Sequence, residues 1–113
     1  MDAFSSTPPA VVIAAARSEV VLYSNEILSR KLVTELAAAR KERGVKVVVL
    51  LPAANFYARG AYHLWLAGQG VLLYRVGGTP FSADFAVIDR TYLLTGNRIG
   101  NPGSLEDGPT LLV

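Results

Sequence analysis

Short apolar runs alternate with amphipathic stretches along most of this chain. Three runs rich in β-branched residues predict strands, at Glu19–Tyr23, Val45–Leu51 and Val71–Val76. The first two lack alternation of apolar and polar positions, which predicts buried strands covered on both faces. Between the runs, apolar residues fall at helical spacing from about Glu26 to Arg43 and from about Asn55 to Ala67. This order predicts an α/β core with parallel strands and right-handed crossovers.

Local signals mark where these elements begin and end. Asn25 is the expected N-cap of the first long helix, and Gly44 is expected to end it. A short helix over Ala10–Arg17 is expected to precede the first strand, because Pro8 and Pro9 lead into it and proline is tolerated in a first helical turn.

The second half of the chain has a different pattern. Two runs, Phe81–Asp89 and Tyr92–Thr95, are separated by so short a link that they predict a β-hairpin. Residues 97–109 are rich in Gly, Asn and Pro and are expected to be irregular, with a last strand at Leu111–Val113. We expect a flexible segment over residues 1–9 and a single domain over residues 10–113.

Composition narrows the choice of function only slightly. The chain has 113 residues, of which 51% are hydrophobic, which suits one core. Eleven Lys and Arg against nine Asp and Glu give a formal charge of +2, too slight a bias to argue for nucleic acid or membrane. With no cysteine and one histidine, His63, we expect no metal and no cofactor. His63 itself is expected on the surface or partly packed.

We expect the N-terminal stretch to be neither an export signal nor a membrane span. Its apolar stretch runs only from Ala10 to Ala16, and Asp2 stands where a signal peptide would be positive. We expect a cytoplasmic protein without a membrane span.

The hairpin carries the most specific pattern in the sequence. Ser82 and Asp84 precede Asp89, six residues separate Asp89 from Gly96, and Asn97 follows. With the stretches Arg43–Leu51 and Leu66–Tyr74, this pattern resembles one half of a phospholipase D-superfamily domain, whose motif is His-x-Lys-x4-Asp-x6-Gly-Ser-x2-Asn. Only Asp89 and Gly96 agree with that motif; the replaced positions are Ser82, Asp84, Asn97 and Gly100.

The resemblance implies a fold and puts the activity in doubt. It implies a phospholipase D-like half-domain, with a mixed sheet of about five to seven strands flanked by helices. In the family a His attacks phosphorus and a Lys and an Asn stabilise the phosphate oxygens. Ser82 lacks the imidazole and would need a nearby general base, and Asp84 reverses the charge that attracts phosphate.

Alternation along the hairpin strand predicts how these side chains point. Ser82 and Asp84 are expected to share the former pocket, while Phe81, Ala83, Phe85 and Val87 are expected to form the core on the other face. Asp89 has the opposite parity, and we expect it to accept backbone N–H bonds locally, in the Asp89–Thr91 turn.

The function predicted from these changes is a catalytically degenerate phospholipase D-like protein that serves as a structural, regulatory or partner-binding subunit. Two alternatives stay open. One is a phosphodiesterase or endonuclease of the superfamily, using Ser82 and Asp84 in altered chemistry or completed by an intact partner chain. The other binds nucleic acid without cleavage through Arg75, Arg90 and Arg98, although these arginines also suit a solvated surface.

The resemblance also implies an assembly. Single-motif members of this size resemble nucleases that pair with both motifs at a twofold axis, so we expect a homodimer, or a heteromer with another phospholipase D-like chain. Such pairing would bring two copies of Asp84 close together.

Overall fold

Six strands form one mixed sheet in the order β3-β2-β1-β4-β5-β6. The computed structural model describes residues 9–27, 29–57, 62–78, 80–81, 83–96 and 110–112. The strands are β1 (Glu19–Tyr23), β2 (Lys46–Pro52), β3 (Leu72–Val76), β4 (Asp84–Ile88), β5 (Tyr92–Gly96) and β6 (Thr110–Leu112). The helices are α1 (Pro9–Ala14), α2 (Arg30–Arg43), the 3-10 turn η2 (Ala53–Asn55) and α3 (His63–Ala67).

The α/β class and the mixed sheet are confirmed. β1, β2 and β3 pair in parallel, and β4 joins the other edge of β1 in antiparallel orientation. β4 and β5 form the predicted hairpin. The hairpin link is tight because Asp89 and Arg90 both have positive φ, of 54° and 58°, which is the backbone twist that a two-residue hairpin turn needs.

Two helix predictions are wrong at their N-terminal ends. α2 begins at Arg30, and its cap is Ser29, whose Oγ accepts a bond from the N–H of Leu32 at 3.2 Å; Asn25 is not the cap. The helix expected from Asn55 is replaced at its start by η2 and a turn, and the described helix begins only at His63. In both places polar side chains bond to other parts of the chain, which competes with helix formation.

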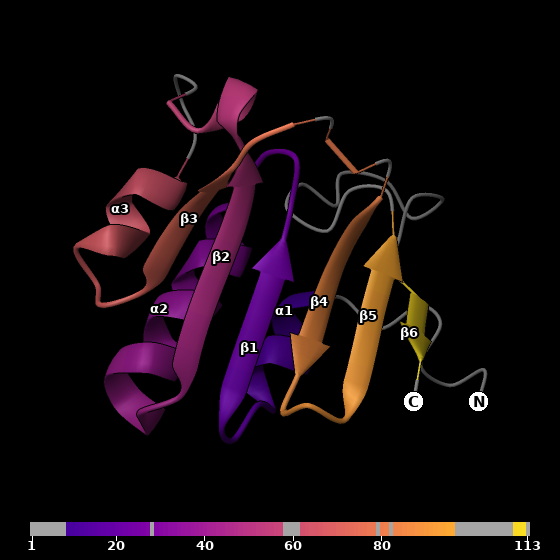
Figure 1. Ribbon diagram of the computed structural model, residues 1–113. Coiled ribbons are helices and arrows are strands. Elements are labelled where there is room, and N and C mark those ends of the chain that lie inside the picture. Colours follow the sequence, from indigo (N-terminus) through magenta and orange to yellow (C-terminus); the bar gives the residue numbers. More distant parts are fainter. Residues whose placement is uncertain are drawn as a thin grey trace.

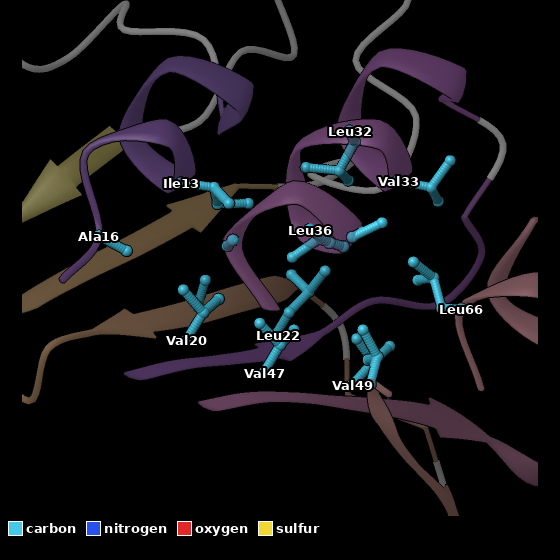
Figure 2. Packing of buried hydrophobic residues seen from close by; sticks show 14 of the residues in the cluster. Ile13, Ala16, Val20, Leu22, Leu32, Val33, Leu36, Val47, Val49 and Leu66 are labelled. Atoms are coloured by element: carbon cyan, nitrogen blue, oxygen red, sulfur yellow. The ribbon is translucent and has the colours of Figure 1, made fainter. Parts of the chain in front are cut away.

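α1 and α2 pack on the same face of the sheet, behind it in Figure 1, and α3 lies beyond the edge strand β3. Figure 2 shows apolar side chains of α1 and α2 pointing down onto β1 and β2, with Leu66 of α3 closing one side. The sheet contributes the fully buried residues Val20, Leu22, Val47 and Val49. This layer is the hydrophobic core.

The other face of the sheet is covered by no helix among the described residues, and Figure 1 looks directly onto it. Its side chains are nevertheless apolar: Val21, Val48, Leu50, Phe85 and Val87 are half-buried there. The sequence pattern therefore correctly placed apolar residues on both faces of the central strands, but the described helices cover only one of them.

The C-terminal end of α2 depends on a glycine. Gly44 has φ of 68°, and Val45 N–H bonds to the carbonyl of Ala39 at 3.0 Å across it, which closes the helix end. A Cβ at Gly44 would meet nothing within 4 Å, so only the left-handed backbone requires glycine there.

We expect Gly44→Ala to lower the free energy of unfolding by about 1–2 kcal/mol, because an L-residue is strained in the left-handed region. Urea denaturation followed by circular dichroism measures the loss. Gly77→Ala is the matched control, since a Cβ at Gly77 also meets nothing within 4 Å and its φ is not positive. Equal losses in the two variants would contradict the explanation.

Candidate functional site

The carboxylate of Asp84 lies at the start of β4, where it is held in a buried polar network. The residue is 2% exposed. Its Oδ2 lies 2.8 Å from the hydroxyl of Ser24, and its Oδ1 accepts bonds from the backbone N–H and the side-chain Nδ2 of Asn25, both at 3.1 Å. Three donors from the end of β1 therefore converge on the one acidic side chain.

Asn25 joins this network to its surroundings. Its Oδ1 accepts the Tyr23 hydroxyl proton at 3.2 Å, its Nδ2 also lies 3.3 Å from the carbonyl of Phe81, and its own carbonyl accepts a bond from Asn55 Nδ2 at 2.6 Å. Tyr23 in turn accepts a bond from the N–H of Phe81 at 3.1 Å. The network thus ties the end of β1 to η2 and to the loop before β4.

Ser24 and Asn25 are the residues that the sequence interpretation missed. Ser24 is fully buried, and its hydroxyl proton is shared between Asp84 Oδ2 and the carbonyl of Glu26, which lies 2.7 Å away. The only signal for them in the sequence was two small polar residues directly after an apolar strand. The prediction of Asn25 as a helix cap does not include its hydrogen bonds to Asp84.

The predicted alternation along β4 agrees with the structure, but the prediction that the odd-numbered face forms the core is wrong. Asp84 shares its face with Ala86 and Ile88, which are buried in the helix-covered core, whereas Phe85 and Val87 lie half-buried on the opposite face. Phe81, predicted as a core residue, is 55% exposed and packs edge-on against Tyr23 at a ring distance of 4.9 Å. The core is on the even-numbered side because α1 and α2 pack there.

Asp89 lies at the opposite end of β4, roughly 17 Å from Asp84 at the usual rise of a strand. Its carboxylate accepts bonds from three consecutive backbone N–H groups, those of Arg17, Ser18 and Glu19, at distances of 2.7–3.1 Å. The Ser18 hydroxyl adds a further bond at 3.0 Å. The predicted structural role fits this geometry, but the prediction that the donors are local to the turn is wrong: they lie about 70 residues earlier.

These hydrogen bonds lower the pKa of Asp89. Its partial burial alone would raise the pKa, but the N–H groups of Glu19, Ser18 and Arg17 and the Ser18 hydroxyl outweigh burial and lower the pKa from 3.8 to about 2. The ionised form is therefore favoured by the fold.

The remaining motif positions, Ser82, Asn97 and Gly100, lie outside the described residues, as does Arg98. The structure consequently leaves untested whether Ser82 shares a pocket with Asp84. What it does establish is that Asp84 and Asp89 do not belong to one site.

The two described arginines among the predicted phosphate contacts also lie apart. Arg90 is in the hairpin turn, mostly exposed, with its Nε 3.3 Å from Glu19 Oε1 at the start of β1. Arg75 is exposed on the edge strand β3, in register with Leu51 near the opposite end of the sheet. They do not form a shared anion site, and nucleic-acid contact by these residues stays a prediction.

His63 differs from its expected position on or near the surface. It is fully buried at the start of α3, and its Nε2 bonds to the carbonyl of Phe56. Its Nδ1 is buried without a hydrogen-bond partner. Since a carbonyl oxygen only accepts, Nε2 is the donor of this bond, so His63 fixes the turn before α3 and is not presented to a substrate.

A surface cavity of about 310 Å³ opens at the other end of the sheet from Asp84. It is lined by Arg40, Gly44, Lys46, Val47, Gly70 and Leu72. One of its two basic residues, Arg40, has a structural explanation: its Nε bonds to the carbonyl of Gly70 at 3.2 Å, and as a cation in the last turn of α2 it complements the helix dipole. No helix among the described residues is long and apolar enough to cross a membrane.

Comparison with solved structures identifies the fold. The phospholipase D family member Nuc from Salmonella typhimurium gives a TM-score of 0.76 at 17% sequence identity, over 91% of this chain and 70% of that chain. NucT from Helicobacter pylori gives 0.75 at 15% identity, over 91% of this chain and 72% of that one. The chain has a phospholipase D fold.

A third similar structure is a DNA-binding protein. TrmBL2, an archaeal chromatin protein with a novel mode of DNA binding, gives a TM-score of 0.56 at 14% identity, over 91% of this chain and 37% of that chain. No protein-family model and no curated protein matches the sequence. At 14–17% identity these similarities show the fold alone, and the function must be argued from the side chains.

We expect Asp89→Asn to lower the free energy of unfolding by about 1–2 kcal/mol at neutral pH, a figure reduced from the full pKa shift because the carboxylate is partly exposed. Because the folded pKa lies below 3.8, this contribution is complete above about pH 4 and is lost as the pH falls toward 2.

The measurement is urea denaturation of both proteins between pH 2 and 7. Asparagine tolerates the positive φ at position 89, so backbone strain should not contribute. Glu26→Gln, on an exposed residue, is the control and should leave the pH profile unchanged. A constant difference between Asp89→Asn and wild type across the whole range would contradict the assignment.

A second pair of variants tests the network around Asp84. Asp84→Lys should destabilise the fold by about 3 kcal/mol or more, because an ammonium group would be buried against the N–H groups of Asn25. Asp84→Asn keeps the size and an acceptor oxygen and should cost about 1–3 kcal/mol. Thermal and urea denaturation give both values; a lysine variant as stable as wild type would show that the site does not require a carboxylate.

Proposed function

We propose that this chain is a catalytically degenerate phospholipase D-like protein that acts as a structural, regulatory or partner-binding subunit. The observation that supports this most directly is the state of Asp84. At the position that resembles the family's lysine stands a carboxylate, 2% exposed and held by Ser24 and Asn25. The O–H and N–H groups that could have donated hydrogen bonds to a phosphate oxygen already donate to a side chain of the same molecule.

The negative charge of Asp84 also supports the loss of phosphate binding. Two unit charges 4 Å apart interact by roughly 1 kcal/mol in water and by about 4 kcal/mol at an effective dielectric constant near 20. A carboxylate in place of an ammonium turns that term from attraction of a phosphate into repulsion. Binding of the family's substrate should therefore be weakened together with its cleavage.

A phosphodiesterase or endonuclease is the second candidate, favoured by the similarity to Nuc and NucT. Such an enzyme would need Ser82 as nucleophile and a base to activate it. His63 is the single histidine of the chain, and it is fully buried and bonded to Phe56. An imidazole base would therefore have to come from a partner chain.

The decisive experiment is a phosphodiesterase assay without added metal, on bis-p-nitrophenyl phosphate and on single-stranded DNA. We expect no turnover by the wild-type protein above the level of a Ser82→Ala variant, because the nucleophile and the phosphate-binding cation are both replaced. Turnover that Ser82→Ala abolishes would overturn the proposal in favour of the second candidate.

Binding without cleavage is measured on the same single-stranded DNA at low and high salt. Contacts between arginines and phosphates should give an affinity that falls steeply as salt rises. An affinity that drops in the combined Arg75→Ala and Arg90→Ala variant and depends on salt would favour the nucleic-acid-binding alternative. Arg30→Ala, on an exposed arginine at the start of α2, is the matched control.

A further inference from the structure

The cavity of about 310 Å³ lies where β2 begins, at the end of the sheet that is far from Asp84. β2 is longer than its neighbour here. Leu72, the first residue of β3, is in register with Val48, so Lys46 and Val47 have no partner on β3. Figure 1 shows β2 extending below β3 at this end. The cavity, which we call the strand-start cavity, lies between this unpaired start of β2 and the turn before β3.

Arg40 reaches the strand-start cavity from the last turn of α2 in a fixed orientation. Its Nε donates to the carbonyl of Gly70 at 3.2 Å. Gly70 has φ of 89°, and a Cβ there would lie 3.3 Å from both Cγ and Nε of Arg40, so only glycine lets the arginine lie against the turn. The Nη1 and Nη2 groups of the guanidinium have no hydrogen-bond partner among the described residues, which leaves them for a ligand.

Lys46 and the backbone of Val47 add donors from β2. Lys46 is exposed, and its side chain forms no hydrogen bond or ion pair with any residue that the structure describes. It lies outside α2, so the helix dipole does not explain it. The N–H of Lys46 donates to the carbonyl of Ser18 on the β1 side. Because successive N–H groups of a strand point to opposite sides, the N–H of Val47 points toward the cavity.

The charges at this end of the sheet are mostly positive. Six cations lie at the starts of β1 and β2, in the last turn of α2 and in the hairpin turn: Arg17, Arg40, Lys41, Arg43, Lys46 and Arg90. Three carboxylates oppose them there, those of Glu19, Glu42 and Asp89. The excess of three positive charges favours an anion.

The contacts of these groups leave the excess charge near the cavity. Glu19 is the register partner of Lys46, but its Oε1 lies 3.3 Å from Arg90 Nε. Lys41 Nζ donates to Gln69 Oε1 at 2.8 Å, and Arg43 Nη2 donates to a backbone carbonyl at 3.1 Å. These acceptors are uncharged, so they hold the two cations in place without neutralising them.

The donors and the size of the cavity restrict the ligand. A guanidinium fork, an ammonium group and a backbone N–H suit a phosphate group, which has three terminal oxygens and carries about two negative charges at neutral pH. Ligand pockets start at about 300 Å³, so this one suits a small molecule. Leu72, which is 45% exposed, lines the cavity and offers an apolar contact to the rest of the ligand.

We propose that the strand-start cavity binds a small organic phosphate monoester. Arg40 and Lys46 hold the phosphate oxygens, and Leu72 packs against the organic group. The inference goes beyond the proposed function and does not depend on it, because the site lies at the opposite end of the sheet from Asp84 and uses none of the donors that bind that carboxylate.

The test is a titration of the isotope-labelled protein with inorganic phosphate and with phenyl phosphate, followed by nuclear magnetic resonance at neutral pH and low salt. The N–H signals of Val47, Gly70 and Leu72 should shift with both ligands. Phenyl phosphate should bind about threefold more tightly or better, because its ring contacts the side chain of Leu72.

Two variants separate the contributions to binding. Lys46→Gln should weaken both ligands about tenfold, because a charge-assisted hydrogen bond is lost. Leu72→Ser should remove the advantage of phenyl phosphate and leave the affinity for inorganic phosphate unchanged. Both side chains are exposed, so the fold should tolerate the changes; if Leu72→Ser does not fold by circular dichroism, Leu72→Thr replaces it. Lys31→Gln, on an exposed lysine at the start of α2, is the matched control and should bind as the wild type does.

Four outcomes would overturn the inference. The first is the absence of any shift with either ligand up to about 10 mM, and the second is equal weakening by Lys46→Gln and Lys31→Gln. The third is inorganic phosphate binding as tightly as phenyl phosphate, which would exclude a site for the organic group. The fourth is single-stranded DNA that shifts the same signals and is weakened more by Lys46→Gln than phenyl phosphate is, which would assign the cavity to nucleic acid. Phosphodiester turnover would refute the proposed function and leave this site unaffected.

Discussion

The carboxylate of Asp89 and the first residues of β1 hold each other in place, and the register of the central strands depends on this contact. Glu19 donates its N–H to Asp89 Oδ1 at 3.0 Å, and the carbonyl of Glu19 accepts the N–H of Asp89 at 2.8 Å. This two-way contact aligns Val20 with Ile88 and so fixes which face of β4 points to the helices. A shift by one residue would exchange Ala86 and Ile88 of the core with Phe85 and Val87 of the face that no described helix covers.

The two acidic residues of the hairpin strand therefore have separate tasks. Asp89 agrees with the family motif, and three of its donors are backbone N–H groups, which no substitution at positions 17–19 other than proline removes. Asp84 departs from the motif, and its donors include the side chains of Ser24 and Asn25. One carboxylate fixes the start of β1 against the end of β4, and the other holds the end of β1 to the start of β4.

Much of the fold could be predicted from the sequence, because β-branched runs and helical spacing are local signals. β1 was predicted at its observed bounds, and the hairpin followed from the short link between two runs. The helix starts and the face of β4 that joins the core could not be obtained in the same way. Asn25 fits a helix cap by its residue type, and only the approach of Asp84, about 60 residues later, determines that it bonds to that carboxylate instead. Which face of β4 joins the core depends on which face α1 and α2 cover, and this is decided by tertiary packing.

The position of Arg75 on the edge strand β3 gives this residue a structural role that does not involve phosphate. β3 is the outermost described strand on its side of the sheet, and Leu72 and Tyr74 on it are exposed and apolar. An unpaired strand of this kind can recruit further strands through its free backbone groups and grow into an open-ended polymer. A charged side chain within such a strand is a common natural barrier to that growth, because stacking like charges along an extended sheet is unfavourable. With Arg75 near its end, β3 disfavours polymerisation along this edge of the sheet.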